Sequence, residues 1–149
     1  MTFSAKSFNE LTAHELYEIL RTRCAVFAVE QNIVCQDMDR VDYRAVHCTL
    51  TDENGEILAY LRVFYANDAD TVVIGRVLTA THGKGHGRVL MERSLEYINE
   101  NMKHKRLYLH SQAYAVGFYE KFGFNVCSDE FMEEGILHVE MEKQVIKFG

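Results

Sequence analysis

The first third of the chain carries a helical pattern of apolar positions. Residues that recur every three to four positions form one stripe, made of Leu16, Ile19, Leu20 and Phe27. Thr12 and Glu15 have the spacing of a capping box, in which each side chain accepts a hydrogen bond from the backbone amide of the other. The pattern predicts a helix that begins at Thr12 and ends near Ala28.

Three β-favouring runs follow this helix, at Val46–Thr51, Ile57–Tyr65 and Thr71–Thr79. Asn54-Gly55 lies between the first two runs, and this dipeptide is typical of tight hairpin turns because its residues accept positive φ. A turn over Ala66–Asp70 separates the second run from the third. We expect the three strands to form an antiparallel meander.

The pattern changes after the third run. A helix with apolar positions at Val89, Leu90, Leu95 and Ile98 opens at a glycine-rich sequence. A strand, a short helix, another strand and a closing strand are then expected at Leu107–His110, Ala113–Phe122, Phe124–Cys127 and Ile136–Met141. This order predicts a mixed α/β or α+β fold, with one central sheet flanked by helices.

Composition places the chain among ordinary globular proteins. It has 149 residues, 48% of them hydrophobic, so we expect a single domain that spans residues 1–149. The formal net charge of −6 argues against a nucleic-acid partner, whose phosphates require a basic surface. No apolar run approaches the ~20 residues of a membrane span, and the first ten residues do not resemble a secretory signal. The four cysteines form no C-x-x-C pair, so we expect free thiols and a cytoplasmic location.

Charge is unevenly distributed along this acidic chain. Between His82 and Arg106 there are six basic and three acidic residues, a net charge of +3, so the rest of the chain has a net charge of −9. The basic stretch contains the glycine-rich turn between a strand and a helix, where unpaired amides and the helix N-terminus favour an anion such as phosphate. The turn lacks the spacing of the P-loop, and Arg88 stands where the dinucleotide fingerprint would need its third glycine.

The same turn is similar to the pyrophosphate loop of the GNAT acetyltransferases. Their motif is Arg or Gln, two residues, Gly, one residue, then Gly or Ala, and His82-Gly83-Lys84-Gly85-His86-Gly87 occupies it with His82 in place of Arg or Gln. Downstream, 115–124 resembles the segment A-x-x-F-Y-x-K-x-G-F of that family. The resemblance covers about Leu11 to Met141, and further details resemble the ElaA-like branch, including R-C-A-V-F-A-V-E-Q at 23–31.

The resemblance implies a mostly antiparallel sheet with one splayed parallel strand pair, and acetyl-CoA as cosubstrate. It implies CoA-binding positions at Val77, Leu78, Thr79, His82, Gly83, Lys84, Gly85, His86, Gly87, Arg88 and Tyr119. Tyr119 would protonate the departing thiolate, and a backbone N–H near Leu78 would stabilise the oxyanion. Tyr119 has an alternative interpretation as an aromatic that only packs between Phe118 and Phe122.

The sequence identifies the catalytic base and the residues that bind the amine acceptor less clearly. Glu30 and His110 are candidate bases, and Gln31, Arg76 and Gln112 are candidate acceptor-binding residues. His47 is a weaker candidate base, and Cys35 or Cys48 a weaker candidate nucleophile, since neither thiol has an activating sequence context. His82 and His86 lack a third ligand at metal spacing, so no metal is expected. The acidic stretches Glu30–Asp42 and Asp129–Glu134 would favour a cationic amine if they flank the cleft.

These features favour an acetyl-CoA-dependent N-acetyltransferase that acts on a primary amine of a small molecule or peptide. A non-catalytic acyl-CoA-binding module of the same fold is the first alternative, because His82 is unusual and no base is evident. A nucleotide or dinucleotide enzyme is disfavoured by the failed loop spacings. Pairing of two copies through an edge strand is compatible with the sequence, which does not determine it.

Overall fold

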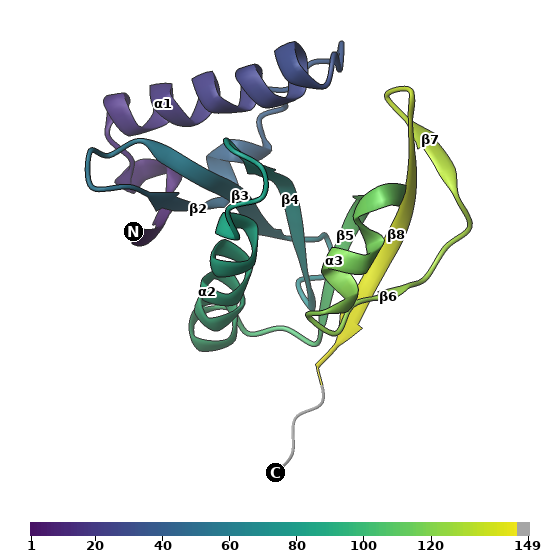
Figure 1. Ribbon diagram of the computed structural model, residues 1–149. Coiled ribbons are helices and arrows are strands. Elements are labelled where there is room, and N and C mark those ends of the chain that lie inside the picture. The colour runs from purple at the N-terminus through teal and green to yellow at the C-terminus, as the bar shows by residue number, and fades with distance from the viewer. Residues whose placement is uncertain (146–149) are drawn as a thin grey trace.

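The computed structural model describes residues 1–145, which fold around one twisted sheet (Figure 1). The strand order is β1-β2-β3-β4-β5-β8-β6, with β7 paired to β8. The strands are β1 Thr2–Ser7, β2 Val46–Thr51, β3 Ile57–Tyr65, β4 Thr71–Thr79, β5 Arg106–Gln112, β6 Asn125–Val126, β7 Phe131–Glu133 and β8 Ile136–Gln144. Every pairing is antiparallel except that of β4 with β5.

Helices cover both faces of the sheet. One face carries α1 (Ala13–Arg23), which continues as a π-helical segment, η2 (Cys24–Glu30). The other face carries α2 (His86–Asn101) and α3 (Val116–Glu120), as Figure 1 shows. Short 3-10 turns lie at η1 (Phe8–Glu10), η3 (Val41–Arg44) and η4 (Ala113–Ala115).

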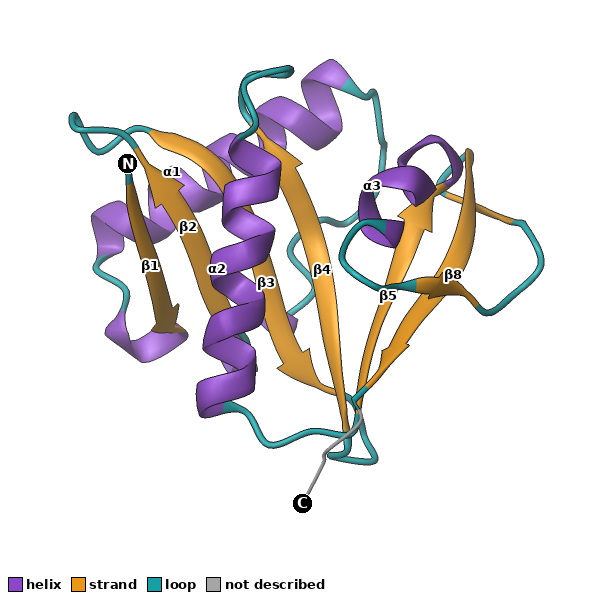
Figure 2. Cartoon of the chain, turned by 60° about the horizontal axis from the view of Figure 1, so that its bottom comes forward, coloured by secondary structure: helices purple, strands orange, loops and turns teal. Residues whose placement is uncertain are grey.

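The parallel strands β4 and β5 pair only at one end. Thr71, Val72 and Val73 lie opposite Arg106, Leu107 and Tyr108, after which no further register is formed between them. Figure 2 shows the two strands diverging from this point toward the β4–α2 connection. The expected splayed pair is therefore confirmed, and it opens the sheet between two strand ends.

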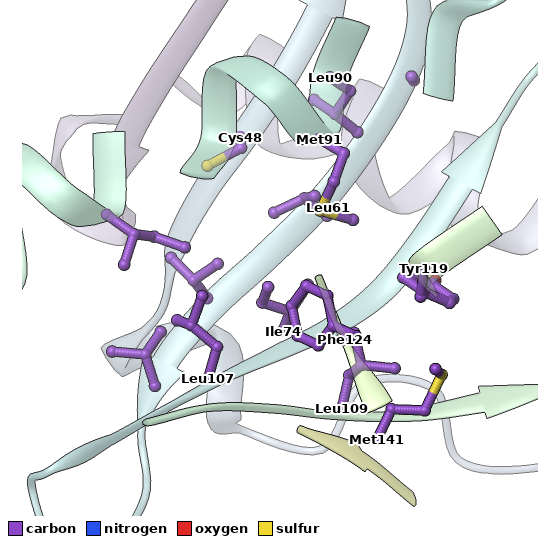
Figure 3. Close-up of a cluster of buried hydrophobic side chains, with 14 of the residues drawn as sticks. Cys48, Leu61, Ile74, Leu90, Met91, Leu107, Leu109, Tyr119, Phe124 and Met141 are labelled. Atoms are coloured by element: carbon purple, nitrogen blue, oxygen red, sulfur yellow. The ribbon is translucent and has the colours of Figure 1, made fainter. Parts of the chain in front are cut away.

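Apolar side chains form a separate core on each side of the sheet. The larger core joins α2 and α3 to the sheet through residues such as Leu90, Met91, Phe124 and Met141, which Figure 3 shows pointing toward one another. The smaller core joins α1 and η2 to β3 and β4 through Ile19, Val26, Tyr60 and Leu78.

Most expected elements are confirmed, with shifted boundaries. The capping box is present, with the Glu15 amide donating to Thr12 Oγ1 over 3.0 Å and the Thr12 amide donating to Glu15 Oε1 over 2.9 Å. The first helix was expected to end near Ala28, but its π-helical continuation reaches Glu30. In the turn Asn54-Gly55 only Gly55 has positive φ, at 82°.

Other differences concern short polar segments. The α2 helix begins at His86 rather than at the start of the glycine-rich turn, and the expected helix 113–122 divides into η4 and α3. Strand β1 was not expected, because its sequence Thr-Phe-Ser-Ala-Lys-Ser has few β-favouring residues; its six pairs with β2 form it. Pairing with a neighbour outweighs weak intrinsic propensity here.

Candidate functional site

The β4–α2 connection forms an anion-binding turn. Gly83 and Gly85 both have φ of +76°, a conformation that side chains with a Cβ rarely adopt, and Gly85 is the N-cap of α2. The first amides of α2 have no partners within the helix, as at every helix start. They lie beside the end of β4, so the sequence-predicted loop is placed at the open end of the splayed strands.

A pocket of about 430 Å³ lies over this turn. Its wall contains residues 82–88 of the loop and the first turn of α2, together with Thr79, Thr81, Glu92, Phe118, Lys121 and Phe122. Lys84, Arg88 and Lys121 are cationic, whereas Glu92 is the one acidic residue that lines this pocket. The pocket therefore combines helix amides with excess positive charge, which suits a phosphate-bearing ligand.

Gly87 allows α2 to approach the strand end and α3 closely. A Cβ at this position would lie 3.3 Å from Thr79 Cγ2 and 3.6 Å from Phe118 Cζ. His86, the first residue of α2, has a buried Nδ1 with no hydrogen-bond partner among the described residues. The predicted CoA-binding residues of this loop thus line one compact surface.

Two predicted residues from distant parts of the chain meet at the edge of this pocket. Glu30, at the end of η2, accepts a hydrogen bond from His82 Nε2 of the loop. His82 Nδ1 lies 3.5 Å from the hydroxyl of Thr79, at the end of β4. Both partners are substantially exposed, with 69% of the His82 side chain and 43% of the Glu30 side chain accessible. The histidine that departs from the family motif therefore links the loop to the end of the first helical segment.

A second contact joins the end of β5 to the residue that follows η2. The amide Nε2 of Gln112, at the end of β5, donates to Oε1 of Gln31 over 3.1 Å. Gln31 directly follows Glu30, and Gln112 follows His110 by two positions on the same face of β5. The structure thus brings both predicted glutamines together, each within two residues of a candidate base.

Arg76 belongs to a network of three arginines and three aspartates. Its Nε donates to Asp37 Oδ1 over 2.7 Å, and its Nη2 donates to the Asp37 carbonyl over 3.0 Å. Arg23 and Arg62, both buried, complete the network through Asp37, Asp39 and Asp42. The Arg76 side chain remains 28% exposed, and its charge is already paired with Asp37.

The network limits the expectation that the acidic stretch Glu30–Asp42 would favour a cationic amine if it flanks the cleft. Three of its four acidic residues, Asp37, Asp39 and Asp42, form ion pairs with arginines from α1, β3 and β4. Burial opposes ionisation of Asp42, but hydrogen bonds from Arg23 and Arg62 outweigh it and lower its pKa. A hydrogen bond from Arg62 lowers the pKa of Asp39 to about 2. Glu30 is the acidic residue of this stretch without an arginine partner among the described residues.

His110 lies in a polar cluster on the face of the sheet that carries α1. Its Nδ1 is 2.9 Å from Glu133 Oε1 on β7, and its Nε2 is 2.9 Å from the Tyr108 hydroxyl. That hydroxyl donates to Glu140 on β8, and burial together with this bond raises the pKa of Tyr108. The cluster was only partly foreseen, because His110 meets Glu133 and Glu140 through strand pairing that the local sequence does not reveal.

Tyr119 packs in the larger core. Its side chain lies between Phe118 and Phe124, with ring centroids 5.1 and 6.2 Å away, and the residue is 7% exposed. Burial raises the pKa of its phenol. Its neighbour Phe118, rather than Tyr119, lines the loop pocket. The proton-donor role of Tyr119 remains a prediction, and a hydroxyl that keeps its proton at neutral pH fits it.

The weaker candidates occupy structural positions. His47 is buried, with Nδ1 2.7 Å from the Tyr60 hydroxyl and Nε2 3.0 Å from the Asp42 carbonyl, and burial lowers its pKa. The Cys48 thiol is fully buried, which raises its pKa to about 12. Cys35 lines a separate cavity of about 220 Å³ beside α1.

Within residues 1–145 no group of three or more His, Cys, Asp or Glu side chains is arranged to hold a metal ion. In that same part of the chain no helix has the length and apolar character required to cross a membrane.

The comparisons with known proteins agree with this geometry. The family model described as an acetyltransferase (GNAT) domain matches residues 12–145. Protein ElaA of Escherichia coli is 38% identical over 143 residues, covering 93% of this chain and 94% of that protein. A UPF0039 protein of Schizosaccharomyces pombe is 37% identical over 148 residues, covering 97% and 98% of the two chains.

Solved structures lead to the same family. The crystal structure of an acyl-CoA N-acyltransferase from Pseudomonas aeruginosa superposes with a TM-score of 0.89 at 32% identity and covers 96% of this chain and 99% of the other. The crystal structure of Escherichia coli ElaA superposes with a TM-score of 0.88 at 35% identity and the same coverage. This chain therefore belongs to the GNAT acetyltransferase family, as the matching family model and the near full-length relatives show, and its splayed strands and glycine-rich loop agree with this.

Proposed function

We propose that the protein transfers the acetyl group of acetyl-CoA to a primary amine of a small molecule or peptide. The observation that carries this proposal is the loop pocket, because it joins helix amides and three cations to the end of β4, which diverges from β5. A pyrophosphate at the loop would direct the rest of an extended cosubstrate along β4. Family membership supports the same cosubstrate.

The exposed backbone of β4 supports the position of the thioester. Beyond Val73 this strand has no pairing with β5, so the backbone groups of Val77, Leu78 and Thr79 on that side are available to the amides of a pantetheine arm. The acetyl carbonyl would lie between the strands, where a backbone N–H of β4 near Leu78 would stabilise the oxyanion formed by amine attack. Direct attack requires both substrates to be bound together in one ternary complex.

Charges around the gap favour a cationic acceptor. Glu30 lies on one side of the Gln31–Gln112 contact, and Glu133 and Glu140 lie near His110 on the other. Gln31 and Gln112, which contact each other, would orient the acceptor together with Arg76. In the proposed reaction His110 or Glu30 accepts a proton from the acceptor ammonium, and the neutral nitrogen attacks the thioester carbonyl. The C–S bond of the tetrahedral intermediate then breaks to give the amide, and Tyr119 protonates the departing CoA thiolate.

Calorimetric titration with CoA and acetyl-CoA tests the cosubstrate. Release of CoA thiol from acetyl-CoA, followed over a panel of cationic, neutral and acidic amines, tests the reaction and the acceptor class. We expect CoA binding and the fastest release with cationic primary amines. Tight CoA binding with no release for any amine would support the alternative of a non-catalytic acyl-CoA-binding module.

Separate variants assign the base. His110→Gln and Glu30→Gln each remove one candidate while keeping a polar side chain of similar size. The true base is expected to lower kcat by about 100-fold or more, with CoA affinity retained. Equal and small effects of both substitutions would assign proton transfer to solvent.

A further inference from the structure

A backbone irregularity in β4 lies next to the proposed oxyanion site. In the β3–β4 ladder Arg62 pairs with Gly75 and Tyr60 pairs with Leu78, so two residues of β4, Arg76 and Val77, lie opposite the single residue Leu61. This is the arrangement of a β-bulge, which bends a strand and redirects its backbone groups. The bulge ends immediately before Leu78.

Arg76 has an unusual conformation within this bulge. Its φ is 54°, in the left-handed region that residues with a Cβ disfavour. Four other residues besides glycine have positive φ in the described chain, at positions 32, 40, 69 and 134, and all four lie outside strands. A disfavoured conformation inside a strand persists when surrounding contacts determine it.

Contacts from a distant segment hold the Arg76 side chain. Asp37 engages it twice, through a carboxylate oxygen 2.7 Å from Nε and a carbonyl oxygen 3.0 Å from Nη2. Asp39 Oδ2 lies 3.5 Å from Nη2. Asp37 is itself fixed, because its other carboxylate oxygen accepts from Nε of the fully buried Arg23 over 3.0 Å. The loop after the first helical segment therefore anchors the bulge through a rigid ion pair.

We infer that Asp37 and Arg76 are positioning residues, which hold the β4 bulge in its left-handed conformation and so set how the β4 backbone next to Leu78 faces the reacting carbonyl. Arg76 thus acts through the backbone that follows it. The inference rests on the proposed acetyl transfer for its effect on rate, whereas the geometry of the bulge is independent of that function.

The test compares two substitutions at one position. Arg76→Ala and Arg76→Gly both remove the guanidinium, but glycine adopts positive φ without an anchor. We expect Arg76→Ala and Asp37→Asn each to lower kcat by about 10-fold to 100-fold, with KM for acetyl-CoA unchanged. Arg76→Gly should retain roughly several-fold more activity than Arg76→Ala, because glycine adopts the left-handed conformation without strain. Adding Asp37→Asn to Arg76→Gly should lower kcat no further.

Glu142→Gln is the matched control. It breaks the Arg106–Glu142 pair, whose 2.7 Å contact and side-chain exposures of 32% and 26% resemble the 2.7 Å, 28% and 26% of Arg76–Asp37. This pair lies at the paired end of β4 and β5, away from the bulge. The control should leave kcat unchanged.

Amide hydrogen exchange at Leu78 gives a readout that does not depend on turnover. Exchange should become faster in Asp37→Asn and Arg76→Ala, and remain near the wild-type rate in Arg76→Gly and Glu142→Gln. Equal loss of activity in Arg76→Gly and Arg76→Ala, or unchanged Leu78 exchange in Arg76→Ala, would overturn the inference. If wild-type protein acetylates no amine, the proposed function fails, and the exchange rates still decide whether the anchor positions the bulge.

Discussion

Replacement of Asp42 by alanine should cause a large loss of stability. Asp42 Oδ1 accepts from Nη1 of Arg23 over 2.7 Å and from Nη1 of Arg62 over 2.9 Å. Arg23 has no exposed surface and Arg62 is 3% exposed, so water cannot replace the lost acceptor without structural change. The variant would leave three arginines facing two aspartates.

The magnitude follows from the cost of an uncompensated buried charge. Removal of one partner from a buried ion pair costs about 3–5 kcal/mol, which for a chain of this size lowers the melting temperature by about 10 °C or more. Native proteins have a total stability of about 5–15 kcal/mol, so the loss is a large fraction of it. Asp42→Asn should lose less, because its amide oxygen still accepts both hydrogen bonds.

Urea denaturation and thermal unfolding at pH 7 measure this loss. Glu96→Gln serves as control, because it breaks the exposed Arg93–Glu96 contact of 3.7 Å and should change the free energy of unfolding by less than about 0.5 kcal/mol. An Asp42→Ala variant within about 1 kcal/mol of wild type would refute the reasoning. The arginine–aspartate network would then not be what fixes the loop to the sheet.

Three further outcomes are expected. Gly87→Ala should weaken CoA binding in calorimetry, because its Cβ would lie 3.3 Å from Thr79 and narrow the approach to the loop pocket; unchanged affinity would count against this position of the cosubstrate. Tyr119→Phe should lower kcat by about 100-fold at neutral pH without changing CoA affinity, and full turnover would end its role as proton donor. Stability should fall between about pH 4 and pH 2, because the Arg62 hydrogen bond lowers the pKa of Asp39 from its ordinary value of 3.8 to about 2 in the folded state, so that its contribution to stability is present above this range; an acid transition complete above pH 4 would contradict it.

Elements with local signals were predictable from the sequence. The capping box at Thr12 and the glycines at 83 and 85 act through neighbouring residues, so their patterns identify the first helix and the anion-binding turn directly. The resemblance to the GNAT motifs added the splayed strands, which no periodicity reveals.

The arginine–aspartate network was not predictable in the same way. Its members come from α1, β3, β4 and the loop between α1 and β2, and their charges meet only after folding. One signal was present, since Arg62 interrupts the apolar run Leu61–Val63 and therefore needed a buried acceptor. The contacts of Glu30 with His82 and of Gln31 with Gln112 are likewise tertiary, although their residues were identified as candidates.

The network also changes how the net charge of −6 acts on an approaching ligand. Because its three aspartates and three arginines cancel, the field outside the protein comes from the remaining, mainly acidic surface. A phosphate-bearing cosubstrate would thus be repelled weakly at long range and attracted only near Lys84, Arg88 and Lys121. Physiological salt screens charges beyond about 8 Å, so the repulsion is damped while contacts inside the pocket persist. Diffusional encounter would consequently depend little on steering, and selection would occur at contact.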